Sequence, residues 1–332
     1  MNEPGFGGLR IFSLRAPSIG DNGPPGMPPA KPLLNPVIRH VNCNLCGADN
    51  FNVLFEKSRR LAHRVVRCNH CGLMYANPQE WVDCLRMGGA GWAGTFEPDG
   101  ADRAYFQKVN AQLADYTRAL QVLSEYCPHK GRLLEIGCGP GLLLAYARTR
   151  GWDVVGLEPD PRFANYARAQ YGFELIEALL PQARAPDGAF DAALLMHVIE
   201  HMPDPLSDLR EARRLLKPGG MLVVETPRFD SFMFKLLGKR ERSLNNWPGH
   251  IYFFTVPTLH RLLEKAGFEV VRTDLVGRTL TVQRLLFNAA LVVHGRRLEP
   301  FVARLGQRLH LDKWRVHINL RDMQRVYARK MH

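Results

Sequence analysis

The sequence predicts an α/β protein with an open, mostly parallel, Rossmann-like sheet, and three observations lead to this prediction. Short apolar runs alternate with amphipathic helical stretches from residue 132 onward. A glycine-rich turn separates the first apolar run from the first helical stretch, and an acidic residue follows the second apolar run. Parallel strands that are buried on both faces and connected by helices produce this alternation.

The first βαβ unit is predicted between Arg132 and Pro161, in RLLEIGCGPGLLLAYARTRGWDVVGLEPDP. Its apolar start is short enough for a buried strand, and LLLAYARTR has helical character. Gly151 stands where a glycine commonly ends a helix. WDVVGLE then supplies a second strand, so the segment opens a doubly wound sheet.

The glycine turn of this unit indicates a nucleoside ligand that lacks phosphates. Glycines let a backbone bend sharply and approach a ligand closely. A dinucleotide fingerprint requires a third glycine where Leu142 stands, and the Lys-Ser/Thr pair of a phosphate-binding loop is absent. Glu158 ends the second strand, where an acid suits a pair of ribose hydroxyls.

The alternation continues through the rest of the chain. The next helix begins at Asp160 and Pro161 and ends at Gly172, because Asp caps helices and Pro suits their first position. The later helices are DPLSDLREARRLL and TVPTLHRLLEKA, each followed by glycine-containing stops. The further strands are predicted in FELIEALL, FDAALLMH, MLVVETP and FEVVRTDLV.

The motif Glu-x-Gly-x-Gly-x-Gly, together with the later acid, resembles the first motif of the class I S-adenosylmethionine-dependent methyltransferases. HVIEHMPDP, LKPGGMLVVETP and GHIYFFTVPTLHRLLEKAGFEV are similar to later landmarks of one branch of that family. The resemblance covers roughly Cys43 to the C-terminus. It implies seven strands with the last one antiparallel, supplied here by INLRDMQRVYARK, and a long insertion at about 277–317.

The resemblance also implies which residues bind S-adenosylmethionine. Glu158 would hold the ribose hydroxyls, the glycine turn would lie against the methionine part, and Glu135 would orient that turn. Many relatives carry an acid after the third strand that contacts adenine, and this sequence has none there, which leaves the adenine contact to backbone and apolar groups. The predicted cofactor-binding residues are Glu135, Gly137, Cys138, Gly139, Gly141, Glu158, Pro159, Ala178, Leu179, Met196 and His197.

Four of the seven cysteines form two C-x-x-C-G units, Cys43 with Cys46 and Cys68 with Cys71. Each unit directs two thiolates to one point, and two units provide the tetrahedral sulfur set that suits Zn²⁺. All four positions are sulfur, so the predicted zinc is structural. Iron in the same site, disulfides and chance spacing are the alternatives.

Histidines supply the candidate catalytic groups. His197, Glu200 and His201 spell H-x-x-E-H, but a peptidase zinc site needs a helix, whereas the preceding residues predict a buried strand. His250 lies in the segment that covers the substrate in the resembling family, where it is able to accept a hydroxyl proton. The predicted catalytic residues are His250 first and His201 second, with a structural role for His250 weighed equally.

The domain organisation follows from composition. Residues 1–36 are rich in Gly and Pro and predict a disordered leader without a secretory signal. Residues 37–80 form the predicted zinc-binding module, 81–130 a linker and helical lid, and 131–332 the methyltransferase domain. No apolar run is long enough to span a bilayer. A cytoplasmic protein is expected, with peripheral contact at the inner membrane face as the further option.

Basic residues collect near the C-terminus. The formal charge is +12, and from Arg272 onward 13 Lys and Arg face 4 acids. LLFNAALVVHGRRLEPFVARLGQRLHL has apolar helical spacing with arginines between, which suits an anionic membrane, an acidic substrate, RNA or merely a solvated face. We therefore expect a methyltransferase for a small or lipid-linked acceptor, such as a sugar derivative or a phenolic compound. The alternatives are an RNA methyltransferase and a non-catalytic zinc-bearing protein that binds or senses the cofactor.

Overall fold

A computed structural model describes most of the chain from residue 37 onward. The described residues are 37–58, 61, 63–81, 97, 98, 100, 102–241, 244, 250–282, 285, 286, 306, 308, 309, 311 and 314–331. The predicted leader lies outside them, as do residues 82–96 of the predicted linker and most of the basic insertion. All of the described residues belong to one unit of the chain, which begins at Pro32.

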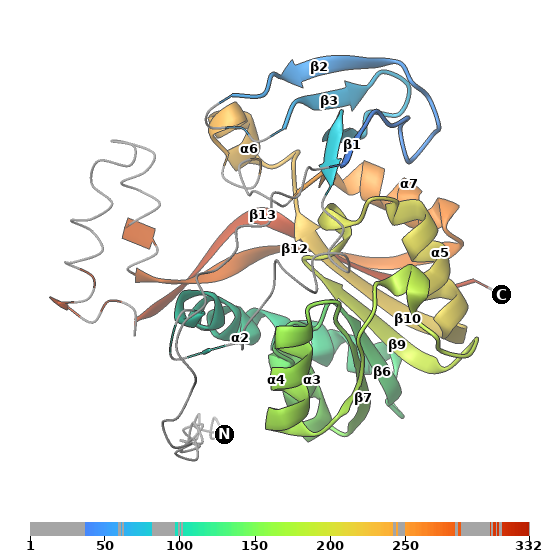
Figure 1. Ribbon diagram of the computed structural model, residues 1–332, viewed down its shortest axis with the longest axis vertical. Helices are drawn as coiled ribbons and strands as arrows, with labels where there is room; N and C mark the ends of the chain where they lie inside the picture. Colours follow the sequence, from blue (N-terminus) through green and yellow to red (C-terminus); the bar gives the residue numbers. More distant parts are fainter. Residues whose placement is uncertain are drawn as a thin grey trace, which may run out of the picture. The chain divides into compact units, whose positions relative to one another are not determined.

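The main sheet has seven strands in the order β12-β13-β10-β9-β6-β7-β8 (Figure 1). The strands β8, β7, β6, β9 and β10 run parallel, and β13 pairs antiparallel with both β10 and β12. The predicted open sheet with an antiparallel last strand is therefore confirmed. In chain order the strands are β6 (Gly131–Ile136), β7 (Trp152–Leu157), β8 (Glu174–Ile176), β9 (Phe190–Met196), β10 (Leu216–Pro227), β12 (Phe268–Thr281) and β13 (Arg315–Lys330).

Two layers of helices cover this sheet, because its strand residues point alternately to opposite faces. One face packs against α2 (Arg103–Tyr126), α3 (Leu142–Thr149) and α4 (Pro161–Tyr171), and it includes Leu194. The other face packs against α5 (Pro205–Leu215) and α7 (Val256–Lys265), and it includes the adjacent Leu195. None of the described helices is long and apolar enough to cross a membrane.

A second, four-stranded sheet has the order β11-β4-β3-β2. Three of its strands come from the cysteine-rich segment, namely β2 (Phe51–Phe55), β3 (Val65–Cys68) and β4 (Met74–Ala76). The fourth, β11 (Tyr252–Phe253), comes from the segment before α7 and pairs with β4. One face of this sheet packs against α6 (Phe232–Leu237), and β1 (Val37–Arg39) pairs separately with β5 (Gln79–Trp81).

The elements differ from the predicted ones mainly in length. β8 has only three residues, because Leu180–Gln182 forms a short 3-10 helix where the sequence predicted the end of a strand. β10 begins at Leu216, five residues before the predicted start. β12 extends to Thr281 and β13 begins at Arg315, so the ends of the predicted insertion are continuations of these two strands.

Candidate active site

The glycine turn lies at the carboxyl edge of the main sheet, between β6 and α3. The amides of Gly137 and Cys138 both donate to the carbonyl of Leu157 at the end of β7. Gly137 has φ 72°, and a Cβ atom on it would lie 2.7 Å from Cγ2 of Val198. A side chain is therefore excluded by strain and by contact, and the turn touches the loop that follows β9.

Two buried carboxylates flank this turn, and the described residues give neither a cationic partner. Glu158 accepts from the amide of Gly139 at 2.7 Å and from the amide of Asp160 at 2.9 Å. Burial raises its pKa to about 7, although these two hydrogen bonds oppose the shift. Burial and then the charge of Glu158 raise the pKa of Glu135 well above its usual value, and Oε2 of Glu135 has no hydrogen-bond partner among the described residues.

The remaining predicted cofactor-binding residues follow the carboxyl ends of neighbouring strands. Pro159 comes after β7 and is half-buried, and Ala178 and Leu179 follow β8 and are also half-buried. Met196 ends β9 and is buried, and His197 comes next. Because these strands are parallel, their ends meet at one edge, and the structure thus places all the predicted residues at the same edge of the sheet as the glycine turn.

His197 is held between the carboxylates of Glu200 and Glu225, and the sequence analysis did not assign the second of these to the site. Its Nδ1 lies 3.5 Å from Oε1 of Glu200, and its Nε2 lies 3.4 Å from Oε1 of Glu225. Burial lowers the pKa of His197, but the two carboxylates outweigh that effect and raise it. His197 also has φ 59°, a conformation that residues other than glycine seldom adopt and that tends to occur at functional sites.

A buried ion pair continues this network into the last strand. Nε of Arg325 on β13 lies 2.6 Å from Oε2 of Glu225 on β10, and both side chains are almost fully buried. Nη2 of Arg325 donates to the backbone carbonyl of Asp115 on α2 at 2.9 Å. The carboxylate of Asp115 in turn accepts from the backbone amide and hydroxyl of Thr279 on β12. The network therefore connects the carboxyl edge of the sheet with the helix that covers it.

The two predicted catalytic histidines lie together beside Glu200. Their ring centroids are 4.7 Å apart, and Nε2 of His250 lies 3.8 Å from Oε1 of Glu200. His250 is buried and His201 is exposed. Burial raises the pKa of Glu200, but His197, His250 and His201 more than offset this and lower it to about 2. The H-x-x-E-H residues lie on a strand end and a single 3-10 turn, so the peptidase reading lacks the helix that it needs.

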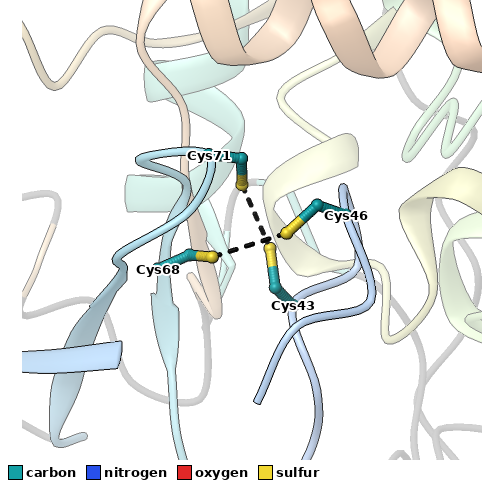
Figure 2. Close-up of side chains that lie close together, drawn as sticks. All are labelled: Cys43, Cys46, Cys68 and Cys71. Atoms are coloured by element: carbon teal, nitrogen blue, oxygen red, sulfur yellow. Dashed lines mark hydrogen bonds between the residues drawn. The ribbon is translucent and has the colours of Figure 1, made fainter. Parts of the chain in front are cut away.

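The four predicted metal ligands converge on one point (Figure 2). Their sulfur atoms lie within 4.8 Å of one another, with closest pairs of 3.3 Å for Cys43 and Cys71 and 3.5 Å for Cys46 and Cys68. The four thiols are free rather than paired in disulfides. Four sulfurs at 2.3 Å from a tetrahedral zinc would lie about 3.8 Å apart, so this donor set fits zinc after small adjustments.

The chain matches the family described as "Methyltransferase domain" over residues 105–273, just over half of its length. The chain belongs to this methyltransferase domain family. The resemblance seen in the glycine turn is thereby confirmed. The matched region runs from the first turns of α2 into β12, so it contains the glycine turn, Glu158 and the loop after β9.

Individual relatives cover less of the chain. A ubiquinone biosynthesis O-methyltransferase of Cereibacter sphaeroides is 36% identical over 163 residues, which are 45% of this chain and 65% of the relative. A tRNA U34 carboxymethyltransferase of Saccharophagus degradans is 31% identical over 173 residues, which are 48% of this chain and 52% of the relative. The chain thus spans about half to two thirds of the length of these relatives.

Among solved structures, a S-adenosylmethionine-dependent methyltransferase of Thermotoga maritima, described as a possible histamine N-methyltransferase, is similar over 69% of this chain and 96% of its own. Its sequence identity is 24% and its TM-score is 0.47. A putative methyltransferase of Bacillus halodurans is 17% identical with a TM-score of 0.45 and covers 63% of this chain and 99% of its own.

Sequence reasoning about the methyltransferase domain missed Glu225 and Arg325. Each stands inside a run that otherwise reads as a buried strand, MLVVETP and MQRVYA. A charged residue in such a run indicates a partner or a function, because an isolated buried charge is costly. That signal was present in the sequence, but the pairing of the two strands was needed to show which charges meet.

Proposed function

We propose that the protein transfers the methyl group of S-adenosylmethionine to an oxygen of a small or lipid-linked acceptor, such as a phenolic compound or a sugar derivative. The observation that carries this proposal is the contact between two kinds of site. The glycine turn, with its two buried acids, contacts Val198 in the loop that follows β9. The same loop carries Glu200 and His201, which lie beside His250. A donor site and a proton acceptor thus share one edge of the sheet.

The residues of the turn suit the proposed donor. The unpartnered Oε2 of Glu135 is a buried acceptor that a ligand's hydroxyl or ammonium group would satisfy. Glu158 would accept the two ribose hydroxyls, and the turn glycines would let the methionine part approach the backbone. Pro159, Ala178 and Leu179 would line the nucleoside, and Met196 and His197 would lie near the transferred methyl group. Two raised carboxyl pKa values without a local cation also favour a cationic ligand.

On the acceptor side, His250 would take the proton of the attacking hydroxyl. The oxygen would form a bond to the methyl carbon while the carbon–sulfur bond breaks and its electron pair returns to sulfur. Glu200, 3.8 Å from His250, would stabilise the imidazolium that results. His201 is exposed and is the second candidate base. Most of the catalysis would come from alignment of donor and acceptor and from exclusion of water.

Relatives support an oxygen of a small molecule as the acceptor. One curated relative is named "Ubiquinone biosynthesis O-methyltransferase", and its similarity extends over 45% of this chain. The tRNA-directed relative keeps RNA as the second candidate. A radiolabelled methyl donor supplied with quinols, phenols, sugar nucleotides and tRNA in parallel should label one of the first three. Label confined to tRNA would make RNA the substrate, and no label on any of them would favour the non-catalytic alternative.

The donor is tested by binding. Calorimetry with S-adenosylmethionine or its demethylated product should detect one site, and Glu158→Ala should weaken it by about 1–3 kcal/mol, because buried hydroxyls lose a charged acceptor. Glu125→Ala is the matched control, since Glu125 is an exposed acid near the end of α2 that pairs with Arg272. Tight binding of a nicotinamide dinucleotide and none of the methionine derivative would overturn the donor assignment.

A structural zinc ion on the four cysteines completes the proposal. The metal would cross-link the two C-x-x-C turns and leave no open coordination position for chemistry. Elemental analysis should give one zinc per chain in the purified protein and in a Cys127→Ser variant, whose thiol lies outside the cluster. A Cys46→Ser/Cys71→Ser variant should lose the metal. A metal-free protein with an intact cysteine segment would contradict the zinc assignment, and iron in its place would change the metal only.

The basic C-terminal region is proposed to contact an anionic membrane or the charged part of a lipid-linked acceptor. The supporting observation is its charge, 13 Lys and Arg against 4 acids from Arg272 onward. Vesicles that contain acidic lipids should pellet the protein, whereas neutral vesicles should not, because each basic residue near the surface contributes about 1 kcal/mol. Salt-sensitive RNA binding without vesicle binding would reverse this preference. Cytoplasmic residence, peripheral to the inner membrane face, is the corresponding location.

A further inference from the structure

The segment that carries His250 belongs to the sheet of the cysteine-rich region. The strand β11 begins two residues after His250 and pairs antiparallel with β4, with Tyr252 opposite Tyr75. The amide of Ala76 donates to the carbonyl of Ile251 at 2.8 Å, which extends this pairing toward His250. The rings of Tyr75 and Tyr252 also stack, with their centroids 6.3 Å apart.

The same segment is tied on its other side to the loop after β9. The amide of Ile251 donates to the carbonyl of Glu200 at 2.9 Å. Ile251 is therefore held by hydrogen bonds to both β4 and Glu200, and His250 precedes it directly. Since Nε2 of His250 is 3.8 Å from Oε1 of Glu200, a displacement of β11 would alter the distance between these two side chains.

The cysteine cluster determines where β4 lies. Cys68 is the last residue of β3, and the chain reaches β4 three residues after Cys71, so the turn between the two strands carries two of the four sulfurs. The other two sulfurs, on Cys43 and Cys46, join this turn to the segment that follows β1 (Figure 2). A bond network through the sulfurs would thus restrain the register between β3 and β4.

The helix α7 connects the chain beyond β11 to both cysteine turns. Arg261 donates to the carbonyl of Cys71, and Nζ of Lys265 donates to the carbonyl of Leu45 at 2.6 Å. The cysteines also share one hydrophobic core with α5, α7 and one face of the main sheet. The stretch from Ile251 to Lys265 therefore contacts the cysteine-rich region through the pairing of β11 with β4. It contacts the same region again at both C-x-x-C turns.

We infer that the four cysteines are positioning residues for the acceptor side of the active site. By fixing the turn between β3 and β4 they hold β11, and β11 holds His250 against Glu200. The cysteine-rich region is then a structural part of the site rather than a separate appendage. The inference rests on the proposed function only where it gives His250 a role with the acceptor, because the coupling between the cysteines and β11 is physical and measurable without turnover.

Hydrogen exchange in the full-length protein tests this coupling. We compare Cys46→Ser/Cys71→Ser with the control Cys127→Ser, whose half-buried thiol lies outside the cluster. In the double variant, the amides of Ile251 and Ala76 should exchange at least about tenfold faster. The hydrogen bonds between β4 and the His250 segment would then open without unfolding of the main sheet, which costs less free energy. The amides of Leu134 and Leu194, in the middle of β6 and β9, should change less than about twofold. Affinity for the methyl donor should also stay within about twofold of the wild-type value.

Four outcomes decide between the possibilities. Unchanged exchange at Ile251 and Ala76 after loss of the metal would overturn the inference, as would equal acceleration throughout the main sheet. If the coupling appears and kcat falls while the donor affinity is kept, both the inference and the role of His250 are supported. If the coupling appears and kcat is unchanged, the positioning stands and the role of His250 in the proposed function fails.

A second variant covers the case in which the double cysteine variant does not fold. Arg261→Gln/Lys265→Gln retains all four cysteines and removes only the two side-chain contacts from α7 to the cysteine turns. It should accelerate exchange at Ile251 and Ala76 by a smaller factor, about threefold, with β6 and β9 unchanged. If this variant keeps its metal and the amides of Ile251 and Ala76 do not exchange faster, the inference is overturned.

Discussion

The two sides of the candidate active site each contain a pair of buried carboxylates, but the pKa values of the two pairs are shifted in opposite directions. Beside the glycine turn, burial raises the pKa of Glu135 and Glu158, and the described residues supply no cationic partner. Beyond β9, cationic side chains overcome the effect of burial and lower the pKa of Glu200 and Glu225. The first pair is left for a ligand to complete, whereas the second is already balanced by the protein.

This difference assigns distinct physical tasks to the two sides. A site with uncompensated buried acids gains most from a ligand that brings hydroxyl donors or positive charge, as the proposed sulfonium donor does. A site that is neutralised internally keeps its side chains in place before any ligand arrives, which is what alignment of an acceptor requires. Variants should therefore affect ligand binding on the first side and folding on the second.

The largest effect is expected from removal of the cation on the second side. Arg325→Met leaves the buried Glu225 without its nearest cation and with only His197 beside it, and breaking a buried ion pair in this way costs about 3–5 kcal/mol of unfolding free energy. Urea denaturation at neutral pH measures the loss. Arg329→Met, on an exposed side chain of the same strand, should change stability by less than about 0.5 kcal/mol.

A compensating variant sharpens this result. Glu225→Gln/Arg325→Met removes both charges, so it should recover part of the lost stability, because no uncompensated carboxylate remains. A single Arg325→Met variant that loses less than about 1 kcal/mol, or a double variant that is worse than the single one, would mean that the ion pair does not balance the second side.

The next effect concerns the glycine turn. Gly137→Ala places a methyl group 2.7 Å from Cγ2 of Val198 at a residue with φ 72°, and this conformation alone costs about 1–2 kcal/mol. Gly172→Ala is a matched control, since Gly172 has φ 63° but no atom within 4 Å of the added carbon. Both variants should lose stability, but only Gly137→Ala should weaken donor binding. Equal donor affinity in the two variants would place the donor elsewhere.

The sequence was informative where one stretch of chain contains a whole feature. The glycine turn, Glu158 and the helix caps at Asp160 and Asp204 are local patterns, and the structure has these caps as hydrogen bonds to the amides of Arg162 and Ser207. The convergence of the four cysteines also followed from spacing, because each C-x-x-C unit is itself a local turn.

The sequence was least informative where contacts join distant strands. Glu225 and Arg325 are a hundred residues apart, and only the antiparallel pairing of β10 with β13 brings them together. The pairing of β11 with β4 was missed for the same reason, since a two-residue strand has no periodicity to detect. β8 was predicted too long because the apolar pattern of Leu179 and Leu180 continues into a 3-10 turn.

The raised pKa of Glu158 predicts a pH dependence on the first side only. Its pKa in the folded protein is about 7, well above the usual value of a glutamate, so the ionised form that accepts ribose hydroxyls is lost as the pH falls below 7. Donor affinity should therefore be constant above about pH 8 and fall by up to about tenfold per pH unit below pH 7. Calorimetry across this range should show the slope, and Glu158→Gln should bind weakly with no such slope.

The smallest effect should come from an exposed ion pair at the opposite end of the same sheet. Arg132 stands near the amino end of β6, and its guanidinium lies 2.8 Å from Glu174 and 3.2 Å from Asp153. The side chains of Arg132, Glu174 and Asp153 are 37%, 61% and 70% exposed, so water and salt screen both of these ion pairs. The pair of Arg325 with Glu225 is buried and is therefore screened much less. Arg132→Gln should cost no more than about 1 kcal/mol of stability and leave donor binding unchanged. A double-variant cycle with Glu174→Gln isolates the ion pair from the contact of Arg132 with the Phe190 ring. A coupling energy as large as that between Glu225 and Arg325, or one that persists in 1 M salt, would show that burial is not what separates the two pairs.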